Sequence, residues 1–337
     1  MTSGVSIAFV CASASVDRSV AQELKLLFDS DQEVRKVGAN FAVNNAEVLR
    51  EDYKRELKVK SLLCGMNTFS GLDFYHSAMI LQHAPGLEDF LLAHDLAVLA
   101  IANGVNEAKW LSAATLDRYL SRAGELQRYG TQYIVDGDGK EVRQPTDLNV
   151  SDAIREKLDV PRLKMKDKLE RYRQPRLKRL GDLVRLRDKL IRLDRLDASD
   201  KRIRELASRE KAFIIREVKT TMTTNLSYTG KDAVIAAEIV SNSDLLSDQL
   251  FAHDLAIIAL SHGDQDALPI AARTLDSFLM KTARPQRFAT QIEFNYPHPP
   301  KVYFVDPSVP DCLRVAFGVK SLDDAKKYAT GLSKLVR

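Results

Sequence analysis

Four residues between positions 83 and 118 carry side chains suited to acid–base catalysis: His83, His94, Asp117 and Arg118. Imidazole changes its protonation state near neutral pH, and a carboxylate bonded to it holds the ring tautomer that proton transfer requires. A guanidinium binds anionic groups through several N–H donors. We therefore predict that His83 or His94 is the acid–base group of a catalytic site and that Arg118 contacts an anion.

A second set of polar residues is predicted to bind the ligand. Its members lie near His83 or in the string "LQRYGTQY" at 126–133, and they are His76, Gln82, Gln127, Arg128, Tyr129, Gly130, Thr131 and Gln132. Arg128 is an alternative anion contact, the glutamine amides would orient the ligand, and Gly130 would allow its close approach. The other interpretation is structural, because Gln and Thr side chains often satisfy free backbone groups where a helix ends.

The chain repeats itself at an offset of 159 residues. The stretch "LLAHDLAVLAIANGVNEAKWLSAATLDRYL" at 91–120 returns as "LFAHDLAIIALSHGDQDALPIAARTLDSFL" at 250–279, and "QRYGTQ" returns as "QRFATQ". No gap is needed from Val59 and Val218 to Arg155 and Arg314. We interpret this pattern as a tandem duplication with a first unit at 15–160, a charged linker at 161–180 and a second unit at 181–337.

The second copy has lost part of the polar set. The counterparts of His76, Gln82, His83, Arg118 and Gly130 are Ile235, Ser241, Asn242, Ser277 and Ala289. The copy nevertheless keeps both glutamines and the threonine of the repeated string, which favours a structural role for those three side chains. The sequence therefore places any working site in the first unit and predicts a pseudo-site in the second.

Each unit is expected to be a set of packed helices with a small β-hairpin, which makes the whole chain a predominantly α-helical α+β protein. A helix from about residue 73 to 83 should end at Pro85-Gly86, because proline cannot donate a helical hydrogen bond. Two Ala-rich helices, at 87–103 and 106–122, should form an antiparallel hairpin. Asp-Gly pairs at 136–139 are typical of the turn of a β-hairpin.

The helical hairpin leads to a specific prediction about one pair of side chains. Residues equally far from the turn of an antiparallel hairpin lie at the same height, so His94 and Asp117 are expected to hydrogen-bond. The second copy retains the pair as His253 and Asp276. This retention favours a structural bond over a catalytic one, because a buried histidine also needs a partner.

Composition restricts the partners. No apolar run is long enough for a membrane helix, and three widely spaced cysteines fit a reducing, cytoplasmic location. The N-terminal apolar stretch is short. No Lys or Arg precedes it, whereas secretory signals normally have one there, and secretion stays an alternative.

Residues 155–211 hold 21 Lys and Arg against 11 Asp and Glu. Such a basic surplus is one sign of nucleic-acid binding. However, leucines three and four apart at 176–196 predict a basic amphipathic helix that could bind a protein partner, and nucleic acid is not expected.

Known chemical motifs are scarce. No nucleophile elbow, dinucleotide fingerprint or phosphate-binding loop occurs, and no cofactor can be assigned. His83, the His94-Asp95 pair and Asp117 superficially resemble the metal ligands of the all-helical HD phosphohydrolases. Those families space their ligands much farther apart, so we predict no metal site and keep this chemistry as the weaker alternative.

Five strings together resemble one family of proteins. They are "DSDQEVRK", "DFYHSAMILQH", "EDFLLAHDLAVLAI", "AKWLSAATLDRYL" and "LQRYGTQY". They are similar to an uncharacterised family of bacterial and fungal proteins, catalogued as a domain of unknown function, whose members share Gln-His, Ala-His-Asp/Glu-Leu-Ala, Asp-Arg and Gly-Thr-Gln motifs. The resemblance covers roughly residues 20–160, includes Asp31, Gln32 and Arg35 of the opening motif, and implies a fold and a polar cluster without an activity.

Two classes of function follow from these observations. The first is a small-molecule-binding protein or acid–base enzyme that holds a small polar or anionic ligand in the first unit. The alternative is a non-catalytic helical interaction module in which the same polar groups only tie the hairpin to the β element. The first is supported if His83 and His94 point into one solvent-reachable concavity, and it fails if the two rings are buried apart and fully hydrogen-bonded.

Overall fold

The computed structural model describes residues 11–36, 46–63, 69–163, 181–194, 201–224, 227–295 and 297–332. Contacts divide the chain into two compact units, Met1–Asp147 (unit 1) and Leu148–Arg337 (unit 2). The sequence repeat continues past this division, to Arg155 and Arg314. Residues 1–10 of the N-terminal apolar stretch and most of the predicted linker lie outside the described residues.

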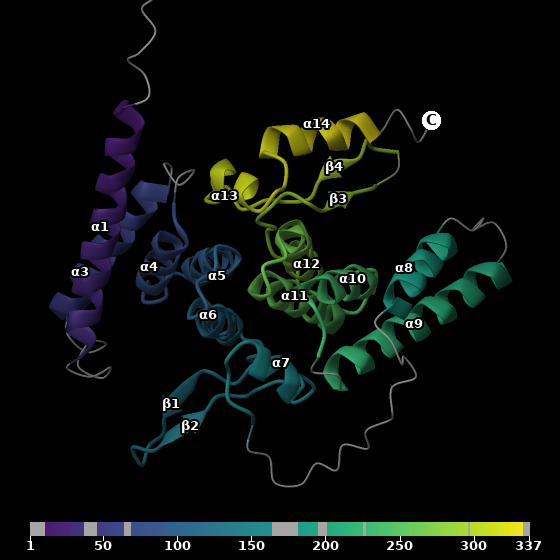
Figure 1. Cartoon of the computed structure of the whole chain (residues 1–337), viewed down its shortest axis with the longest axis horizontal. Helices are drawn as coiled ribbons and strands as arrows, with labels where there is room; N and C mark the ends of the chain where they lie inside the picture. Colours follow the sequence, from purple (N-terminus) through teal and green to yellow (C-terminus); the bar gives the residue numbers. More distant parts are fainter. Residues whose placement is uncertain are drawn as a thin grey trace, which may run out of the picture. The chain divides into compact units, whose positions relative to one another are not determined.

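Unit 1 is a layer of helices with one β-hairpin (Figure 1). Its elements are α1 (Cys11–Arg35), α3 (Ala46–Leu62), α4 (Gly71–Leu81), α5 (Leu87–Ala102), α6 (Ala108–Arg122), β1 (Tyr133–Val135) and β2 (Glu141–Arg143). Helix α5 packs against both α4 and α6, and α4 also contacts α1 and α3. Helix α4 is therefore the element that joins the α1–α3 pair to the α5–α6 hairpin.

Local sequence signals define the ends of α4. Ser70 caps its N-terminus by accepting a hydrogen bond from the Asp73 amide, and the Asp73 side chain accepts one from the Ser70 amide. This reciprocal capping box satisfies two backbone donors that the first helical turn leaves free. The helix ends at Leu81 with Gln82 as its C-cap, so His83 lies in the following turn, two residues beyond the last helical position.

Helix α5 forms the core of unit 1. Its buried residues include Ala93, Ala97 and Ala100, each fully inaccessible to solvent. Small side chains on this helix allow α4 and α6 to approach closely from both sides, which keeps the interior densely packed. Fully burying larger neighbours such as Leu96 contributes about 1.5–3 kcal/mol per side chain. The predicted antiparallel helical hairpin is confirmed, and its turn contains Gly104 at φ +86°.

The predicted β-hairpin is also present. Strands β1 and β2 pair antiparallel, with Tyr133 opposite Arg143 and Val135 opposite Glu141. Asp136 accepts hydrogen bonds from the Asp138 and Lys140 amides in the turn. Most of this two-stranded sheet is exposed to solvent.

Unit 2 repeats these elements at the same offset of 159 residues. Its elements are α7 (Asp152–Lys157), α8 (Gly181–Asp194), α9 (Lys201–Thr224), α10 (Gly230–Val240), α11 (Leu246–Ser261), η2 (Gln265–Ala267), α12 (Leu268–Lys281), β3 (Ile292–Glu293), β4 (Lys301–Val302), α13 (Asp311–Ala316) and α14 (Leu322–Leu332). Helices α10 and α11 match α4 and α5 residue for residue, and Thr229 forms a capping box with Asp232 as Ser70 does with Asp73. The two units are similar sets of packed helices, each with a helical hairpin and a small β-hairpin.

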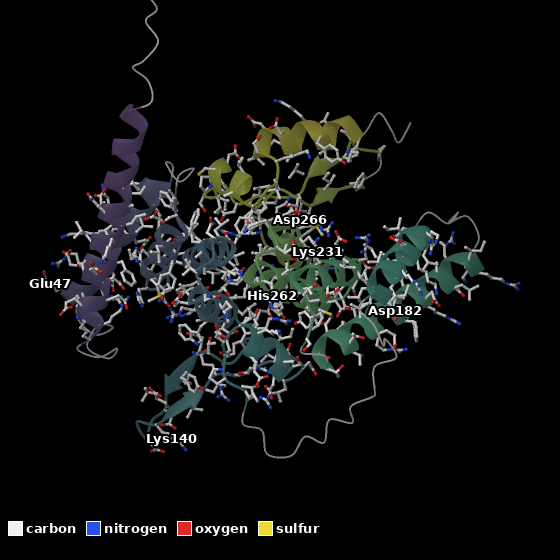
Figure 2. The ribbon with its side chains drawn as sticks, in the orientation of Figure 1. Glu47, Lys140, Asp182, Lys231, His262 and Asp266 are labelled. Atoms are coloured by element: carbon white, nitrogen blue, oxygen red, sulfur yellow. The ribbon has the colours of Figure 1, made fainter. Side chains whose placement is uncertain are left out.

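The basic amphipathic helix predicted at 176–196 appears as α8, with its two ends outside the described residues. Leu183 and Leu190 on its apolar stripe are almost fully buried, and α8 contacts α9 and α10 within unit 2. The stripe therefore stabilises unit 2 itself, and charged side chains such as Asp182, labelled in Figure 2, occupy its other faces. Among the described helices, none is long and apolar enough to cross a membrane.

Candidate functional site

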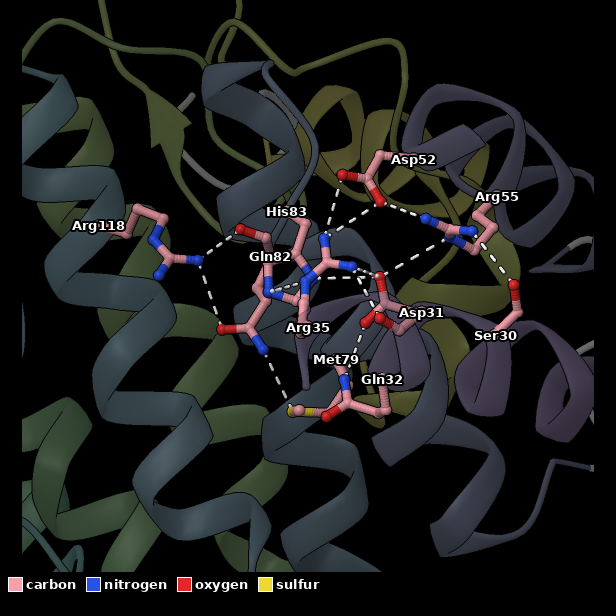
Figure 3. Close-up of polar contacts among 10 residues, drawn as sticks. All are labelled: Ser30, Asp31, Gln32, Arg35, Asp52, Arg55, Met79, Gln82, His83 and Arg118. Carbon is pink, nitrogen blue, oxygen red and sulfur yellow. Dashed lines mark hydrogen bonds and ion pairs between the residues drawn. The ribbon is translucent and has the colours of Figure 1, made fainter. Parts of the chain in front are cut away.

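Arg35, at the end of α1, is the centre of a polar cluster in unit 1 (Figure 3). Its Nε donates to His83 Nε2 at 3.1 Å, and its Nη2 donates to both carboxylate oxygens of Asp52 at 3.1 Å. Its Nη1 donates to the Asp31 backbone carbonyl at 2.9 Å and lies 2.8 Å from Asp31 Oδ1. One guanidinium thus connects α1, α3 and the turn after α4.

Four charged side chains of this cluster form a closed network of alternating sign. Arg35 contacts Asp31 and Asp52, and Arg55 lies 2.5 Å from Asp52 Oδ1 and 3.8 Å from Asp31 Oδ1. All four are mostly buried, and Asp31 is fully inaccessible. Two guanidiniums balance two carboxylates, so the network itself carries no net charge.

The Asp31 carboxylate is incompletely satisfied. Its Oδ2 accepts a hydrogen bond from Gln32 Nε2 at 2.8 Å. Its Oδ1 has Arg35 Nη1 and His83 Nδ1 within 3.3 Å, yet neither contact has hydrogen-bond geometry, and both Oδ1 and His83 Nδ1 are buried. A buried polar group without a well-formed bond costs free energy. The site therefore holds a carboxylate and an imidazole that a small rotation of the ring would join.

His83 is held as a neutral imidazole. Because Nε2 accepts from Arg35, the ring proton must sit on Nδ1, which faces Asp31. Burial lowers the pKa of His83 below its ordinary value, the charges of Arg35 and Arg118 act in the same direction, and Asp31 only partly opposes them. The side chain keeps 23% of its surface exposed, so the ring can be reached from solvent.

The lowered pKa of His83 predicts how the stability of unit 1 depends on pH. Below about pH 6.5 the unfolded chain takes up a proton on this residue before the folded protein does. The free energy of unfolding should therefore fall as the pH drops from about 6.5 towards the folded pKa. In His83→Asn this part of the fall should disappear, which urea unfolding at pH 7.5 and 5.5 measures. An unchanged pH dependence in the variant would contradict a depressed pKa at His83.

Arg118 lies on the other side of Gln82 from this network. Its Nη1 donates to the Gln82 backbone carbonyl at 2.5 Å, and its Nε donates to Gln132 Oε1 at 3.2 Å. The guanidinium stands over the Phe90 ring, 5.8 Å from its centre. Burial, together with the nearby charges of Arg122 and Arg35, lowers the pKa of Arg118 to about 10. Within the part of the chain that the structure describes, Arg118 has no carboxylate partner.

His76, on α4, packs against α1 and not against the charged network. Its ring stacks on Phe28 with the ring centres 4.3 Å apart, and its Nδ1 is buried without a hydrogen bond. Burial lowers the pKa of His76. In the structure His76 therefore packs between α4 and α1, while His83, seven residues later, faces the charged network.

His94 does not join this cluster. It is fully buried on α5, and its Nδ1 lies 2.8 Å from the backbone carbonyl of Ser112. His253 in unit 2 repeats the arrangement with Ala271 at 3.0 Å. A ring in the same core position of both units is a packing and hydrogen-bonding element of the α5–α6 hairpin. His94 therefore does not share a solvent-reachable concavity with His83, but the two rings are not both buried and fully bonded, because His83 is 23% exposed and its Nδ1 has no hydrogen bond to the described residues.

Asp117 has a different partner from the one predicted. Instead of His94, its carboxylate accepts from the backbone amides of Arg128, Tyr129 and Thr131 and from the Thr131 hydroxyl, at 2.5 to 2.9 Å. Equal height in the hairpin did not determine the direction in which each side chain points. Burial raises the pKa of Asp117, and the four donors oppose that shift. The residue holds the segment after α6 against the helix.

The string "LQRYGTQY" owes its polar side chains to this connection. Gln127 Nε2 donates to the Gln132 and Gln144 carbonyls, and Gln127 Oε1 accepts from the Gln132 amide. Gln132 Nε2 donates to the Ala114 carbonyl. Unit 2 repeats these bonds through Gln286 and Gln291. The two glutamines and the threonine thus make the same structural hydrogen bonds in both units, and Gln132 also contacts Arg118.

Arg128 and Tyr129 are buried, at 3% and 0% exposed. The counterpart of Arg128 in unit 2, Arg287, forms a buried ion pair with Asp306. Neither Arg128 nor Tyr129 is thus available to a ligand from solvent. Gly130 has φ +88°, and its counterpart Ala289 keeps φ +58°. The glycine serves a left-handed backbone conformation that alanine adopts at some cost, rather than the close approach of a ligand.

The charged cluster is the part of unit 1 that unit 2 lacks. At the positions of Asp31 and Arg55 unit 2 has Leu190 and Ile214, which are 2% and 0% exposed. At the positions of Arg35 and Asp52 it has Asp194 and Lys211, which form an ion pair of reversed polarity. The pair between the two helices is thus kept, whereas Asp31, Arg55, His83 and Arg118 are replaced by uncharged residues.

Asp52 and Arg55 were missed by the sequence analysis. They lie upstream of Val59, where the two copies share few identical residues, and charged residues on a helix usually face solvent. Extending the offset of 159 residues back to residue 31 would have identified the cluster, because it aligns Asp31 and Arg55 with the apolar residues Leu190 and Ile214. Asp31 and Arg35 entered only through the family resemblance.

Two other features bear on the site. Among the described residues no three His, Cys, Asp or Glu side chains are placed to hold a metal ion. Two shallow surface depressions lie in unit 2, one lined by Lys231, His262 and Asp266, which Figure 2 labels, and one lined by Glu293, His298 and Lys301. Neither includes a predicted site residue.

The comparisons with known proteins add no assignment to this geometry. No protein-family model, no curated protein and no solved structure matches the chain.

Proposed function

We propose that unit 1 binds a small anionic ligand and that His83 acts on it as an acid–base group. The observation that carries the proposal is the contrast between the units. Both keep the hydrogen bonds of His94, Asp117 and the glutamine pair, but only unit 1 has Asp31, Arg55, His83 and Arg118. Both units keep these structural hydrogen bonds, but only unit 1 has the charged cluster. This difference indicates that the cluster serves something other than folding.

The energetics of buried charges support this interpretation. Replacing a buried ion pair by well-packed apolar residues is often neutral or stabilising. Unit 2 contains that replacement, since Leu190 and Ile214 stand where unit 1 has Asp31 and Arg55. The fold does not require the charges, so their presence in unit 1 favours a binding or catalytic role.

The chemistry assigned to His83 follows from its contacts. Asp31 faces Nδ1 and would fix that nitrogen as the protonated one, which leaves the Nε2 lone pair as the atom that takes a proton. Arg35 Nε donates to this lone pair in the structure, so Arg35 must move away from Nε2 before His83 can take a proton there. Arg118, without a carboxylate partner in the described chain, is the anion contact.

A second role is proposed for unit 2. It keeps the helices and the hairpin bonds but has uncharged residues at the positions of Asp31, Arg55, His83 and Arg118. This fits a scaffold or interaction module. We further propose that the chain arose by tandem duplication within the family of unknown function that its motifs resemble. Three widely spaced cysteines favour a cytoplasmic location.

Equilibrium enrichment from a deproteinised cell extract tests the proposed function. Wild type, His83→Asn and Arg118→Ser are incubated with the extract, and the small molecules retained with each protein are identified by mass spectrometry. Both substitutions introduce the residue that unit 2 has at that position, so folding should be retained. Wild type should retain at least one anionic compound that neither variant retains.

The matched control is Arg273→Ala. Arg273 is an exposed guanidinium of unit 2 that contacts Ser241, the counterpart of Gln82. Its removal should leave the retained compounds unchanged. Equal retention by wild type and by both site variants, or no retained compound in any preparation, would contradict the proposed function.

A further inference from the structure

We propose that the anionic group bound by Arg118 is a carboxylate, held by Arg118 Nη2 with Gln82 Nε2 as the second donor. The inference rests on the proposed function and specifies the ligand class. It depends on the free donors, on the local charge and on the way in which neighbouring residues hold the guanidinium.

The donors of Arg118 are only partly used. Nε is bonded to Gln132 Oε1, and Nη1 is bonded to the Gln82 backbone carbonyl and lies 3.4 Å from Gln82 Oε1. Nη2 has no partner among the described residues, and the side chain is partly exposed. A guanidinium carries two N–H groups on this nitrogen. Arg118 therefore presents two N–H groups of one fixed guanidinium to solvent.

Gln82 provides a donor with a poor partner. Its Nε2 lies 3.2 Å from the Met79 sulfur, and the residue is 6% exposed. A thioether is a weak acceptor, so this buried amide nitrogen lacks a good hydrogen bond. The Oε1 atom of the same amide contacts Arg118 while Nε2 is directed towards Met79, so the underused nitrogen belongs to the amide group that contacts the guanidinium (Figure 3).

The local charge determines which anion fits. Arg35 and Arg55 are balanced by Asp31 and Asp52, and His83 is neutral, so Arg118 is a positive charge without a carboxylate partner in the described chain, with the charge of Arg122 nearby. A carboxylate carries one negative charge at neutral pH and would balance it. A phosphate monoester carries between one and a half and two charges, which is more than the single charge of Arg118 offsets. A single planar anion matches both the charge and the donor set.

Neighbouring bonds hold Arg118 in place before a ligand arrives. Gln132 Oε1 accepts from Arg118, while Gln132 Nε2 is anchored on the Ala114 carbonyl and on the Thr131 hydroxyl. A donor held in its binding conformation loses little entropy when it binds. Unit 2 has Gln291 in the same anchored position but Ser277 in place of the arginine.

The proposal is tested by titrating the intact protein with acetate and following His83 by NMR. Carbon-13 labelling of histidine gives one ring signal per residue, and the signal missing in His83→Asn identifies His83. A bound carboxylate offsets the charge of Arg118, so acetate should raise the His83 pKa in wild type. Acetamide, which has the same shape without the charge, should not. The buffers contain neither carboxylate nor phosphate.

Variants assign the effect to the two donors. Arg118→Ser should weaken acetate binding by about tenfold or more, since a charge-assisted hydrogen bond is lost. Gln82→Ser should weaken it by a few fold, and the control Arg273→Ala should bind acetate as wild type does. Each replacement at 118 and 82 is the residue of unit 2.

The outcomes separate the ligand class from the proposed function. A response to inorganic phosphate without one to acetate would overturn the carboxylate assignment and leave an anion site intact. Equal responses in wild type and Arg118→Ser, or none to any anion, would overturn the site at Arg118. The proposed function is judged separately, by whether wild type retains a compound that His83→Asn does not.

Discussion

Replacing Asp31 alone by leucine is expected to lower the free energy of unfolding of unit 1 by about 3–5 kcal/mol. The substitution leaves Arg55 and Arg35 buried with only Asp52 to balance them. Arg55→Ile alone should cost a similar amount, because it leaves two buried carboxylates with one guanidinium. The double variant Asp31→Leu/Arg55→Ile should lose nothing or gain about 1–4 kcal/mol.

The reason for the opposite result in the double variant is visible in unit 2. Leu190 and Ile214 occupy the same two positions there and are almost fully buried. Arg35 and Asp52 remain paired in the variant, as Asp194 and Lys211 are in unit 2. Residues in one ionic network are coupled, so the single effects should not add.

The measurement can be restricted to unit 1. The only tryptophan of the chain, Trp110, lies on α6. Its fluorescence during urea unfolding therefore reports unit 1, whereas circular dichroism reports both units. A double variant that loses the sum of the two single losses would show that the network is needed for folding, and it would remove the main support for a functional cluster.

Replacing Asp117 by alanine is expected to destabilise unit 1 by at least about 3 kcal/mol. Three backbone amides and one hydroxyl donate to this carboxylate, and each buried donor that loses its acceptor costs about 1–3 kcal/mol. The Trp110 transition should move to lower urea. Thr131→Val, which removes only the hydroxyl, should cost about 1 kcal/mol and gives a graded result if the alanine variant does not fold.

Asp276→Ala is the matched control in unit 2. Asp276 accepts from the amides of Arg287, Phe288 and Thr290 in the same way. This variant should lower the circular dichroism transition of unit 2 without moving the Trp110 signal. If Asp117→Ala left stability unchanged, the carboxylate would be free for the catalytic role first predicted for it.

The repeat in the sequence was sufficient to predict the architecture. Local signals such as the capping box at Ser70, the turn at Gly104 and the Asp-Gly pairs act within a few residues, so their consequences can be read along the chain. The comparison of the copies also divided the polar residues into two groups. Those kept in both units, such as Gln127 and Thr131, form backbone connections.

The partners of each side chain required the tertiary structure. His94 and Asp117 stand at matching heights, but the rotation of each helix about its axis sends one towards Ser112 and the other towards Thr131. Height follows from residue counting, whereas rotation follows from how whole helices pack.

The contacts of the charged cluster also depend on how whole helices pack. The sequence by itself determined two similar helical units, and it identified His83, Gln82 and Arg118 as side chains that only the first unit has. Only the tertiary structure showed that Asp31 and Asp52, on separate helices, surround Arg35 beside His83. Contacts between helices far apart in the sequence are set by packing against α4, and no local pattern of residues encodes them.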